Sequence, residues 1–249
     1  MTEERFDDRI ARERDFHNER FGATEERPED SYYFAVEAAA AAYWRLVRRA
    51  AVAKDVLEYG CSNGGRSIDL ARSARHVTGI DISDVAIAQA RSEAERRSIG
   101  NVSFKVDNAE KMELADASFD LVFGSGILHH LILDTALKEI RRVLRTGGKA
   151  IFFEPLGHNP AINRYRNRTP QSRTVDEHPL LKSDFDLIAR HFSRCEPRFF
   201  GLSTLASIPF RGNAAGRAIR TVGEKIDTVL LSLPGLKWQA WITVMELEA

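Results

Sequence analysis

The residues of this chain best suited to chemistry lie in a short glycine-rich segment, Gly60-Cys61-Ser62-Asn63-Gly64-Gly65, directly after an apolar run that ends in Glu58 and Tyr59. Small residues let a backbone turn sharply and approach a ligand closely. Seventeen residues after Gly64, a second apolar run ends on Asp81. A carboxylate at that place can accept hydrogen bonds from both hydroxyls of a ribose. Together, the two motifs predict a site for an adenosine-containing ligand.

The spacing of the turn distinguishes between two kinds of adenosine ligand. Dinucleotide sites use G-x-G-x-x-G, whereas this turn reads Gly60-x-Ser62-x-Gly64-Gly65 and is preceded by Glu58. A carboxylate there would repel a pyrophosphate and would suit a cation, such as the ammonium or sulfonium of S-adenosylmethionine. Ser62 fits the turn with ordinary backbone angles, but it would be strained at a positive φ.

At these residues the chain resembles the class I S-adenosylmethionine-dependent methyltransferases, whose first motif runs apolar, apolar, Asp/Glu, x, Gly, x, Gly, x, Gly. It departs from that motif at Ser62, where the family usually has glycine. Three further segments follow in the family's order: N-V-S-F-K-V-D-N-A-E, S-F-D-L-V-F-G-S-G-I-L-H-H-L and L-R-T-G-G-K-A-I-F-F-E-P. The ordered resemblance covers Asp55 to Pro155, and four motifs in order are far more specific than one.

The resemblance implies S-adenosyl-L-methionine as the cofactor and assigns its contacts. Asp81 would bind the ribose. Asn108 would receive the adenine amino group in place of the family's usual aspartate, with Asp107 as a neighbour. The other positions expected in the cofactor site are Glu58, Gly60, Cys61, Ser62, Gly64, Ile82, Ala109 and Ser125.

The alternation of apolar runs with helical stretches predicts the elements that position these residues. Strands are expected at residues 55–59, 76–80, 102–106, 119–123 and 149–153, with helices such as 85–97 and 135–144 between them. Such alternation indicates an α/β fold with a parallel sheet covered on both faces. The resemblance implies a Rossmann-like sheet of seven mostly parallel strands. Its antiparallel last strand, in W-Q-A-W-I-T-V-M-E-L-E-A, would lie beside a sixth strand at residues 194–200.

Three segments add to this sheet. Residues 1–50 are expected to form an N-terminal helical arm, in which Phe6, Ile10, Phe16 and Phe21 are loosely spaced as one face of a helix over the ligand site. A frayed, solvated arm is the alternative. Residues 51–249 would form the methyltransferase domain, with a polar acceptor loop at 156–182 and a helical lid at 202–237. Both insertions are expected to carry acceptor specificity.

A proton acceptor is needed only where the methylated group carries a proton. His178 is the first candidate because Asp176 and Glu177 precede it, although the same cluster could simply close the loop onto the sheet. His129 is a second candidate. One imidazole of the pair His129 and His130 is expected to line the cofactor pocket and the other to pack structurally. Glu154 is a third candidate, although it could instead make a polar contact that ends its strand. No metal site is predicted, because the histidines do not stand at ligand spacing with acidic partners.

The composition favours a cytoplasmic enzyme with one large core. The chain has 249 residues, of which 43% are hydrophobic, and equal numbers of basic and acidic residues, 36 each. That balance gives no general attraction to nucleic acid. Two cysteines are too few for a disulfide framework and fit a reducing compartment. The charged N-terminus gives no sign of a secretory signal, and no apolar run is long enough to span a bilayer. Arginines in the acceptor loop and lid indicate either a solvated basic face or an anionic or lipid-linked acceptor.

The resulting prediction is methyl transfer from S-adenosylmethionine to an oxygen or nitrogen of a small molecule. Nucleic-acid and protein acceptors are disfavoured, because Gly124-Ser125-Gly126-Ile127 stands where adenine and amide methyltransferases carry Asn/Asp-Pro-Pro-Tyr/Phe. One alternative is a nicotinamide-dependent oxidoreductase, against which Glu58 and the Ser62 spacing both stand. Another is a non-catalytic S-adenosylmethionine-binding protein, which would bind the cofactor and form no S-adenosylhomocysteine.

Overall fold

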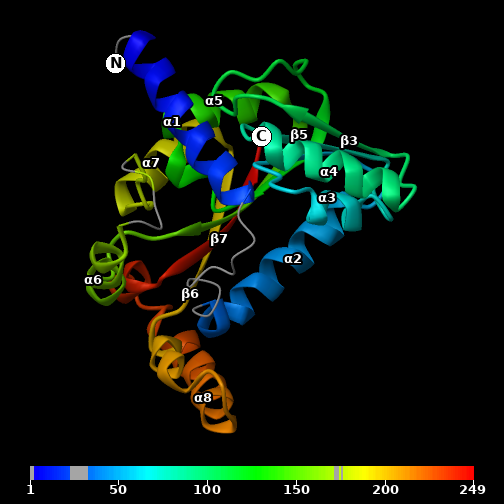
Figure 1. Cartoon of the computed structure of the whole chain (residues 1–249). Helices are drawn as coiled ribbons and strands as arrows, with labels where there is room; N and C mark the ends of the chain where they lie inside the picture. The colour runs from blue at the N-terminus through cyan, green and yellow to red at the C-terminus, as the bar shows by residue number, and fades with distance from the viewer. Residues whose placement is uncertain (1–2, 23–32, 171–173, 175) are drawn as a thin grey trace.

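The computed structural model describes residues 3–22, 33–170, 174 and 176–249. A seven-stranded sheet runs through the molecule in the order β3-β2-β1-β4-β5-β7-β6 (Figure 1). The strands are β1 Asp55–Tyr59, β2 His76–Asp81, β3 Val102–Val106, β4 Phe119–Ser125, β5 Leu144–Pro155, β6 Arg194–Phe200 and β7 Ile242–Glu248. Strands β1 to β5 pair in parallel, and β7 is antiparallel to both β5 and β6. The predicted mostly parallel sheet with its antiparallel last strand is confirmed.

Helices cover both faces of the sheet, which is why the central strands are apolar on both sides. In β1, Val56 packs on the face of α2 (Glu37–Ala51), and Leu57 packs on the opposite face against α5 (Leu133–Val143). Helices α3 (Gly65–Leu70) and α4 (Asp84–Arg96) share the first face, and α7 (Lys182–His191) shares the second. Successive side chains along each strand therefore lie in two separate apolar layers, one on each face of the sheet.

The elements follow one another in the predicted order, and most of their bounds lie within two residues of the predicted ones. The 3-10 turn η2 (Tyr33–Val36) precedes α2, which begins without a side-chain cap at Val36. Strand β5 begins at Leu144, five residues before its predicted start, because Gly147-Gly148 lies within an irregular part of the strand. There the β4–β5 register shifts between the pairs made by Phe119 and Leu121.

The predicted additions are helical. Helix α1 (Glu3–Gly22) forms the N-terminal arm and packs beside α4, and α6 (Pro160–Arg168) lies in the acceptor loop, capped by the Asn159 side chain. Between β6 and β7 run η5 (Ser203–Phe210), α8 (Ala214–Leu230) and η6 (Leu236–Gln239). Figure 1 shows the α8 segment projecting from the body on the side away from α1. Among the described helices, none has both the length and the apolar composition needed to cross a bilayer.

Candidate functional site

A cavity of about 1260 Å³ opens at the carboxyl ends of β1, β2 and β4, with α1 and α2 forming further walls. In open parallel sheets this edge is where ligands bind. Sites for a single small ligand usually measure about 300–1,000 Å³. The cavity therefore has room for a nucleoside cofactor and a second molecule.

Nine of the ten residues predicted to hold the cofactor line this cavity: Glu58, Gly60, Cys61, Ser62, Asp81, Ile82, Asn108, Ala109 and Ser125. The tenth, Gly64, lies behind the turn with φ +76°. A Cβ there would stand 2.6 Å from the Phe104 ring and 2.7 Å from Ala90. Gly64 thus allows the turn to pack against β3 and α4 and does not itself reach the cavity.

Ser62 has a left-handed backbone conformation, with φ +55°. Ser62 therefore has the strained conformation that the sequence analysis distinguished from ordinary backbone angles. For a residue with a Cβ atom, the left-handed region is unfavourable by about 1–2 kcal/mol. Its N–H donates a hydrogen bond of 2.8 Å to Oδ2 of Asp81. The conformation that glycine would adopt freely is therefore kept by serine and stabilised by the carboxylate of the next strand.

The Asp81 carboxylate lies at the end of β2 and is held by backbone groups on both sides. Oδ2 accepts from Ser62, and Oδ1 accepts from the N–H of Ser83 at 2.9 Å. Burial raises the pKa of Asp81, while these N–H groups counteract the shift. Each oxygen keeps acceptor capacity, so the carboxylate can receive two further donors from a ligand.

Glu58 is a buried carboxyl group on the floor of the cavity. Its side chain accepts a hydrogen bond of 2.5 Å from the hydroxyl of Ser67, and the residue is 3% exposed. Burial raises the pKa of Glu58 to about 7. A ligand cation beside it would favour the ionised form, so the position suits a positively charged group.

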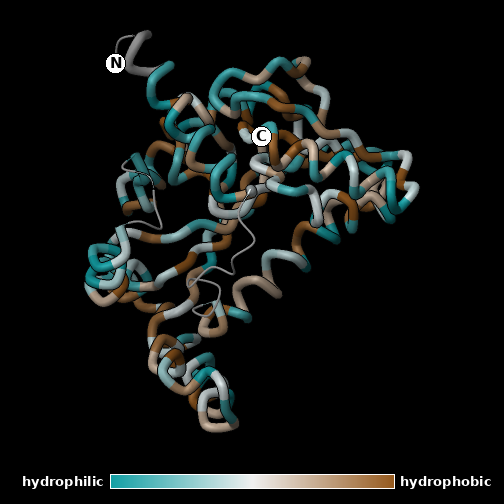
Figure 2. The backbone as a smooth tube through the Cα atoms, in the orientation of Figure 1, coloured by the Kyte–Doolittle hydropathy of each residue, from teal (hydrophilic) through white to brown (hydrophobic). Residues whose placement is uncertain are grey.

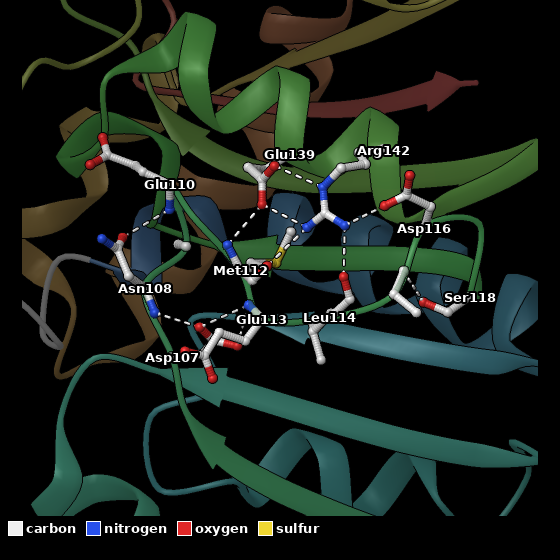
Figure 3. A network of polar contacts seen from close by, with 12 residues as sticks. Asp107, Asn108, Glu110, Met112, Glu113, Leu114, Asp116, Ser118, Glu139 and Arg142 are labelled. Carbon is white, nitrogen blue, oxygen red and sulfur yellow. Dashed lines mark hydrogen bonds and ion pairs between the residues drawn. The ribbon is translucent and has the colours of Figure 1, made fainter.

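The loop after β3 is organised by its own carboxylate and amide groups (Figure 3). Asp107 accepts from the backbone N–H of Asn108 and of Glu113, and it lies 3.3 Å from the Lys105 ammonium. The Asn108 Oδ1 accepts from the N–H of Glu110 at 2.9 Å. The Asp107 carboxylate is thus engaged by groups of its own loop. The Asn108 side chain uses only its oxygen within the loop, so its amide N–H groups can donate to a ligand in the cavity.

Helix α5 holds the same loop from the outside. Arg142 donates to the carbonyl oxygens of Met112 and Leu114, and Glu139 accepts from the N–H of Met112 at 2.7 Å (Figure 3). The Arg142 guanidinium also pairs with Glu139 and Asp116. This network fixes the position of the loop that carries Asn108 and Ala109.

Helix α1 forms one wall of the cavity with a charged face. Arg9, Glu13 and His17 are spaced four residues apart, and all three line the cavity. Arg9 pairs with Glu110 and donates to the carbonyl oxygen of His130 at 3.1 Å. Arg9 and Glu13 are 6% and 5% exposed, so this helix buries charge directly over the site.

The carboxyl-terminal half of α1 is tied to the start of α4. The Asn18 amide donates to Asp84 at 2.6 Å, and the Ser83 hydroxyl donates to Asn18 at 2.6 Å. The Gln89 amide donates to the carbonyl oxygen of Phe21 at 2.9 Å. The sequence prediction placed a helix here through its aromatic residues, but it did not identify the polar residues that face the cavity.

His130 lies among carboxylates and imidazoles in the cavity wall. Its Nδ1 is 3.4 Å from Glu13 Oε2, and its Nε2 is 3.9 Å from Glu177 Oε1. The His17 ring meets it edge-on, with centroids 5.5 Å apart. Burial acts to raise the pKa of Glu13, but the interactions of its carboxylate with His130, Thr174 and His17 outweigh burial and lower the pKa overall. This group links α1, the 3-10 turn η3 (Leu128–His130) that follows β4, and the acceptor loop.

His129 and Glu154, both predicted as catalytic candidates, form a hydrogen-bonded pair. Glu154 is fully buried and accepts from His129 Nδ1 at 2.8 Å and from the N–H groups of Ile127 and Leu128, each at 2.9 Å. His129 lines the cavity, whereas Glu154 does not. The His129 Nε2 makes no hydrogen bond with any described residue, so a ligand in the cavity can reach it.

His178, the first candidate for the proton acceptor, does not line the cavity. Its side chain is 56% exposed and lies 3.3 Å from Asp184, while its backbone N–H donates to the His129 carbonyl oxygen at 2.6 Å. The neighbouring Glu177 lines the cavity instead. The geometry therefore gives no support to His178 as the base, and the acidic residue of the cluster takes the place expected for the histidine.

The two insertions contribute little to the cavity. Within the part of the chain that the structure describes, Glu177 is the one lining residue from 156–182, and none comes from 202–237. The wall expected from these segments is provided by α1 and by Tyr43 and Trp44 of α2. Tyr43 is buried, and its hydroxyl makes no hydrogen bond with the described residues.

The chain is similar in sequence to known methyltransferases. The sequence profile of a methyltransferase domain family matches residues 56–148. A probable S-adenosylmethionine-dependent methyltransferase of Mycolicibacterium smegmatis is 33% identical over 158 residues, covering 60% of this chain and 58% of the relative. An O-methyltransferase of Penicillium expansum is 31% identical over 137 residues, covering 52% and 47%. The chain spans about half the length of these curated relatives.

Among solved structures, the N-methyltransferase NodS of Bradyrhizobium japonicum with bound S-adenosylhomocysteine superposes with a TM-score of 0.61. The alignment covers 94% of this chain and 97% of the other at 15% identity. At that identity the likeness concerns the fold alone, and it includes nearly the whole of both chains.

Proposed function

The chain belongs to the class I S-adenosylmethionine-dependent methyltransferases, and we propose that it transfers a methyl group from S-adenosyl-L-methionine to an oxygen or nitrogen of a small-molecule acceptor. The observation that carries the proposal is the single cavity that holds Glu58, the turn at Ser62, Asp81 and His129 together. The O-methyltransferase among the relatives supports an oxygen acceptor.

The residues present fit this cofactor. Glu58, buried with a raised pKa, would face the cationic methionine part, and Asp81 would accept from the ribose hydroxyls. Asn108 and Ala109 would contact the adenine ring at the end of the loop that α5 holds in place. The cofactor supplies an electrophilic methyl group, so the protein's task is to align the acceptor behind that carbon and to exclude water.

The acceptor's proton would pass to Nε2 of His129. Glu154 holds His129 Nδ1–H and so fixes both the tautomer and the ring orientation, which is the arrangement that makes imidazole an effective base. Glu154 would act through His129 as a positioning residue. Glu13, His130 and Glu177 would border the acceptor on the α1 side.

The cavity wall also favours an anionic group on the acceptor or on the cofactor's amino-acid part. Arg20 and Arg66 line the cavity, and the Arg66 guanidinium lies over the Tyr43 ring, 6.0 Å from its centroid. A guanidinium in such a wall binds carboxylate or phosphate well. An acceptor carrying one of these groups is therefore expected to be methylated faster than its neutral ester.

The test is methyl transfer from labelled cofactor into a pool of cell metabolites, read by mass spectrometry as products heavier by one methylene unit. S-adenosylhomocysteine should form in equal amount. Glu154→Gln serves as the matched variant, because it keeps the side-chain shape and removes the charge behind His129. Cofactor binding without any product would instead favour the non-catalytic alternative, and a nicotinamide absorbance change on turnover would favour the oxidoreductase.

A further inference from the structure

Helix α8 has an inner face that is fully occupied by η5. Asp227 is 6% exposed, and its carboxylate accepts from the N–H groups of Leu202 at 3.0 Å and Ser203 at 2.7 Å. On the same face, a Cβ at Gly223 would lie 3.0 Å from the Thr204 Cα. The helix and the 3-10 segment are therefore in close backbone contact, and this packing accounts for one side of α8 only.

A second face of α8 is apolar and exposed. Val222, Ile226, Val229 and Leu233 are 57%, 44%, 65% and 47% exposed. Their spacing of four, three and four residues places them in one stripe along the helix and its end. Single exposed apolar residues are common, but a contiguous stripe marks an interaction surface. We call these four residues the outer stripe.

The outer stripe lies on the part of the molecule that projects furthest from the sheet. Figure 2 shows apolar stretches along this projection, in the orientation of Figure 1. Phe210 before α8 and Leu236 after it are also exposed, at 46% and 39%. The apolar surface therefore continues beyond both ends of the stripe.

The charges around the outer stripe have one sign. Between residues 203 and 240, the charged residues in the exposed class are Arg211, Arg217 and Lys225. The two acidic residues of α8 are engaged, since Asp227 is buried and Glu224 lies 3.6 Å from Arg220. A surface with an apolar stripe and only basic exposed charges is complementary to anionic lipid head groups over an acyl layer.

We propose that the outer stripe binds in the plane of an anionic lipid bilayer surface, with Arg211, Arg217 and Lys225 at the level of the phosphates. The helix would lie on the bilayer, in keeping with its half-polar composition. Arg220 joins α8 to the cavity wall: it pairs with Glu37, which lines the cavity, and donates to the Phe34 carbonyl oxygen at 3.3 Å. Binding would therefore bring the rim of the cavity close to the membrane. Binding of the outer stripe to the bilayer would not require methyl transfer.

The test is flotation of the full chain with vesicles of phosphatidylcholine alone or mixed with phosphatidylglycerol. Wild type should float with the mixed vesicles, and high salt should weaken the binding. Val222→Glu with Val229→Glu should lower the partition coefficient at least tenfold, because burial of each valine is lost. Arg217→Ser with Lys225→Ser should lower it about fivefold per residue.

The controls use exposed residues outside α8. Val52 is 58% exposed on the loop after α2, so Val52→Glu matches the valine variants and should bind like wild type. Circular dichroism and S-adenosylhomocysteine binding should be unchanged in every variant. Equal binding by the Val222/Val229 variant, or no binding of folded wild type to mixed vesicles, would overturn the proposal. A dimer in gel filtration that only this variant dissociates would assign the outer stripe to a second copy instead.

Discussion

Glu58 makes the stability of the empty protein depend on pH in a defined direction. Its pKa is about 7 in the folded chain because of burial, whereas the ordinary value is 4.5. Between these values the folded state holds the proton and the unfolded state does not. Stability should therefore fall as pH rises from 4.5 to 7, by about 3 kcal/mol in all, and this dependence should be absent in Glu58→Gln.

Denaturant unfolding of both proteins from pH 5 to pH 8 measures this effect. Asp81 and Glu110 also have raised pKa values through burial, so the difference between wild type and Glu58→Gln isolates the contribution of Glu58. Parallel pH profiles for the two proteins would show that Glu58 keeps an ordinary pKa. Bound S-adenosylmethionine should flatten the wild-type profile, because a cation beside Glu58 favours its ionised form.

We expect substitution of His129 and substitution of His178 to have opposite effects on turnover. His129→Ala should lower turnover by about a hundredfold or more, the usual scale for loss of a general base, with little change in cofactor affinity. Glu154→Gln should lower turnover less and shift its pH profile, because the imidazolium loses the charge behind it. His178→Ala should turn over like wild type, since its side chain is exposed and outside the cavity. Steady-state rates at saturating acceptor decide between the two histidines.

At the scale of elements, the sheet was the part most open to sequence prediction. Residues 55–59, 102–106 and 194–200 were placed with the same bounds as β1, β3 and β6. Apolar runs between turn residues identify the inner strands because a sheet covered on both faces demands them. The edge strand β6 has the mixed sequence R-C-E-P-R-F-F, and its place was expected only from the family resemblance. The start of β5 was missed, because Gly147-Gly148 has the composition of a turn and only the pairing with β4 extends the strand through it.

The polar wall of the cavity was beyond sequence prediction for a physical reason. Arg9 reaches partners 101 and 121 positions away, at Glu110 and His130, and local periodicity carries no information about such pairs. Buried charge also contradicts the rule that charged residues on a helix face water. For the same reason, the cluster at 176–178 could be placed near the site, but which of its side chains faces inward depends on how the loop is folded.

Helix α1 is expected to behave as a separable element that closes the cavity. Its amino-terminal half is tied to the body through Arg9, whose loss would leave Glu110 without its cation, while the contacts of Asn18 and Phe21 with α4 would remain. Arg9→Gln should make the chain more sensitive to limited proteolysis within residues 3–22 and weaken cofactor retention, while the main unfolding transition changes little. Arg14→Gln is the matched control, because Arg14 is exposed on the same helix.

Protection of α1 from proteolysis by a bound ligand would show that α1 closes over the cavity and does not merely pack against the body. If α1 covers the bound cofactor, S-adenosylhomocysteine should slow proteolysis of α1 in wild type and in Arg14→Gln, and slow it less in Arg9→Gln. Identical cleavage rates for all three proteins, with and without the ligand, would mean that α1 does not respond to the site.

For the whole molecule, the cofactor assignment predicts a selective effect on unfolding. A ligand that binds only the folded chain stabilises it by about 2.7 kcal/mol at a hundredfold excess over its dissociation constant. S-adenosylhomocysteine should therefore raise the melting temperature, and NAD should not, because its pyrophosphate would meet Glu58 where a dinucleotide site has bare backbone. Asp81→Ala should keep the fold and weaken S-adenosylhomocysteine binding by about 1.5–3 kcal/mol, the range for a hydrogen bond to a charged group. Equal stabilisation by NAD, or unchanged affinity in folded Asp81→Ala, would contradict the assignment of this edge of the sheet as the cofactor site.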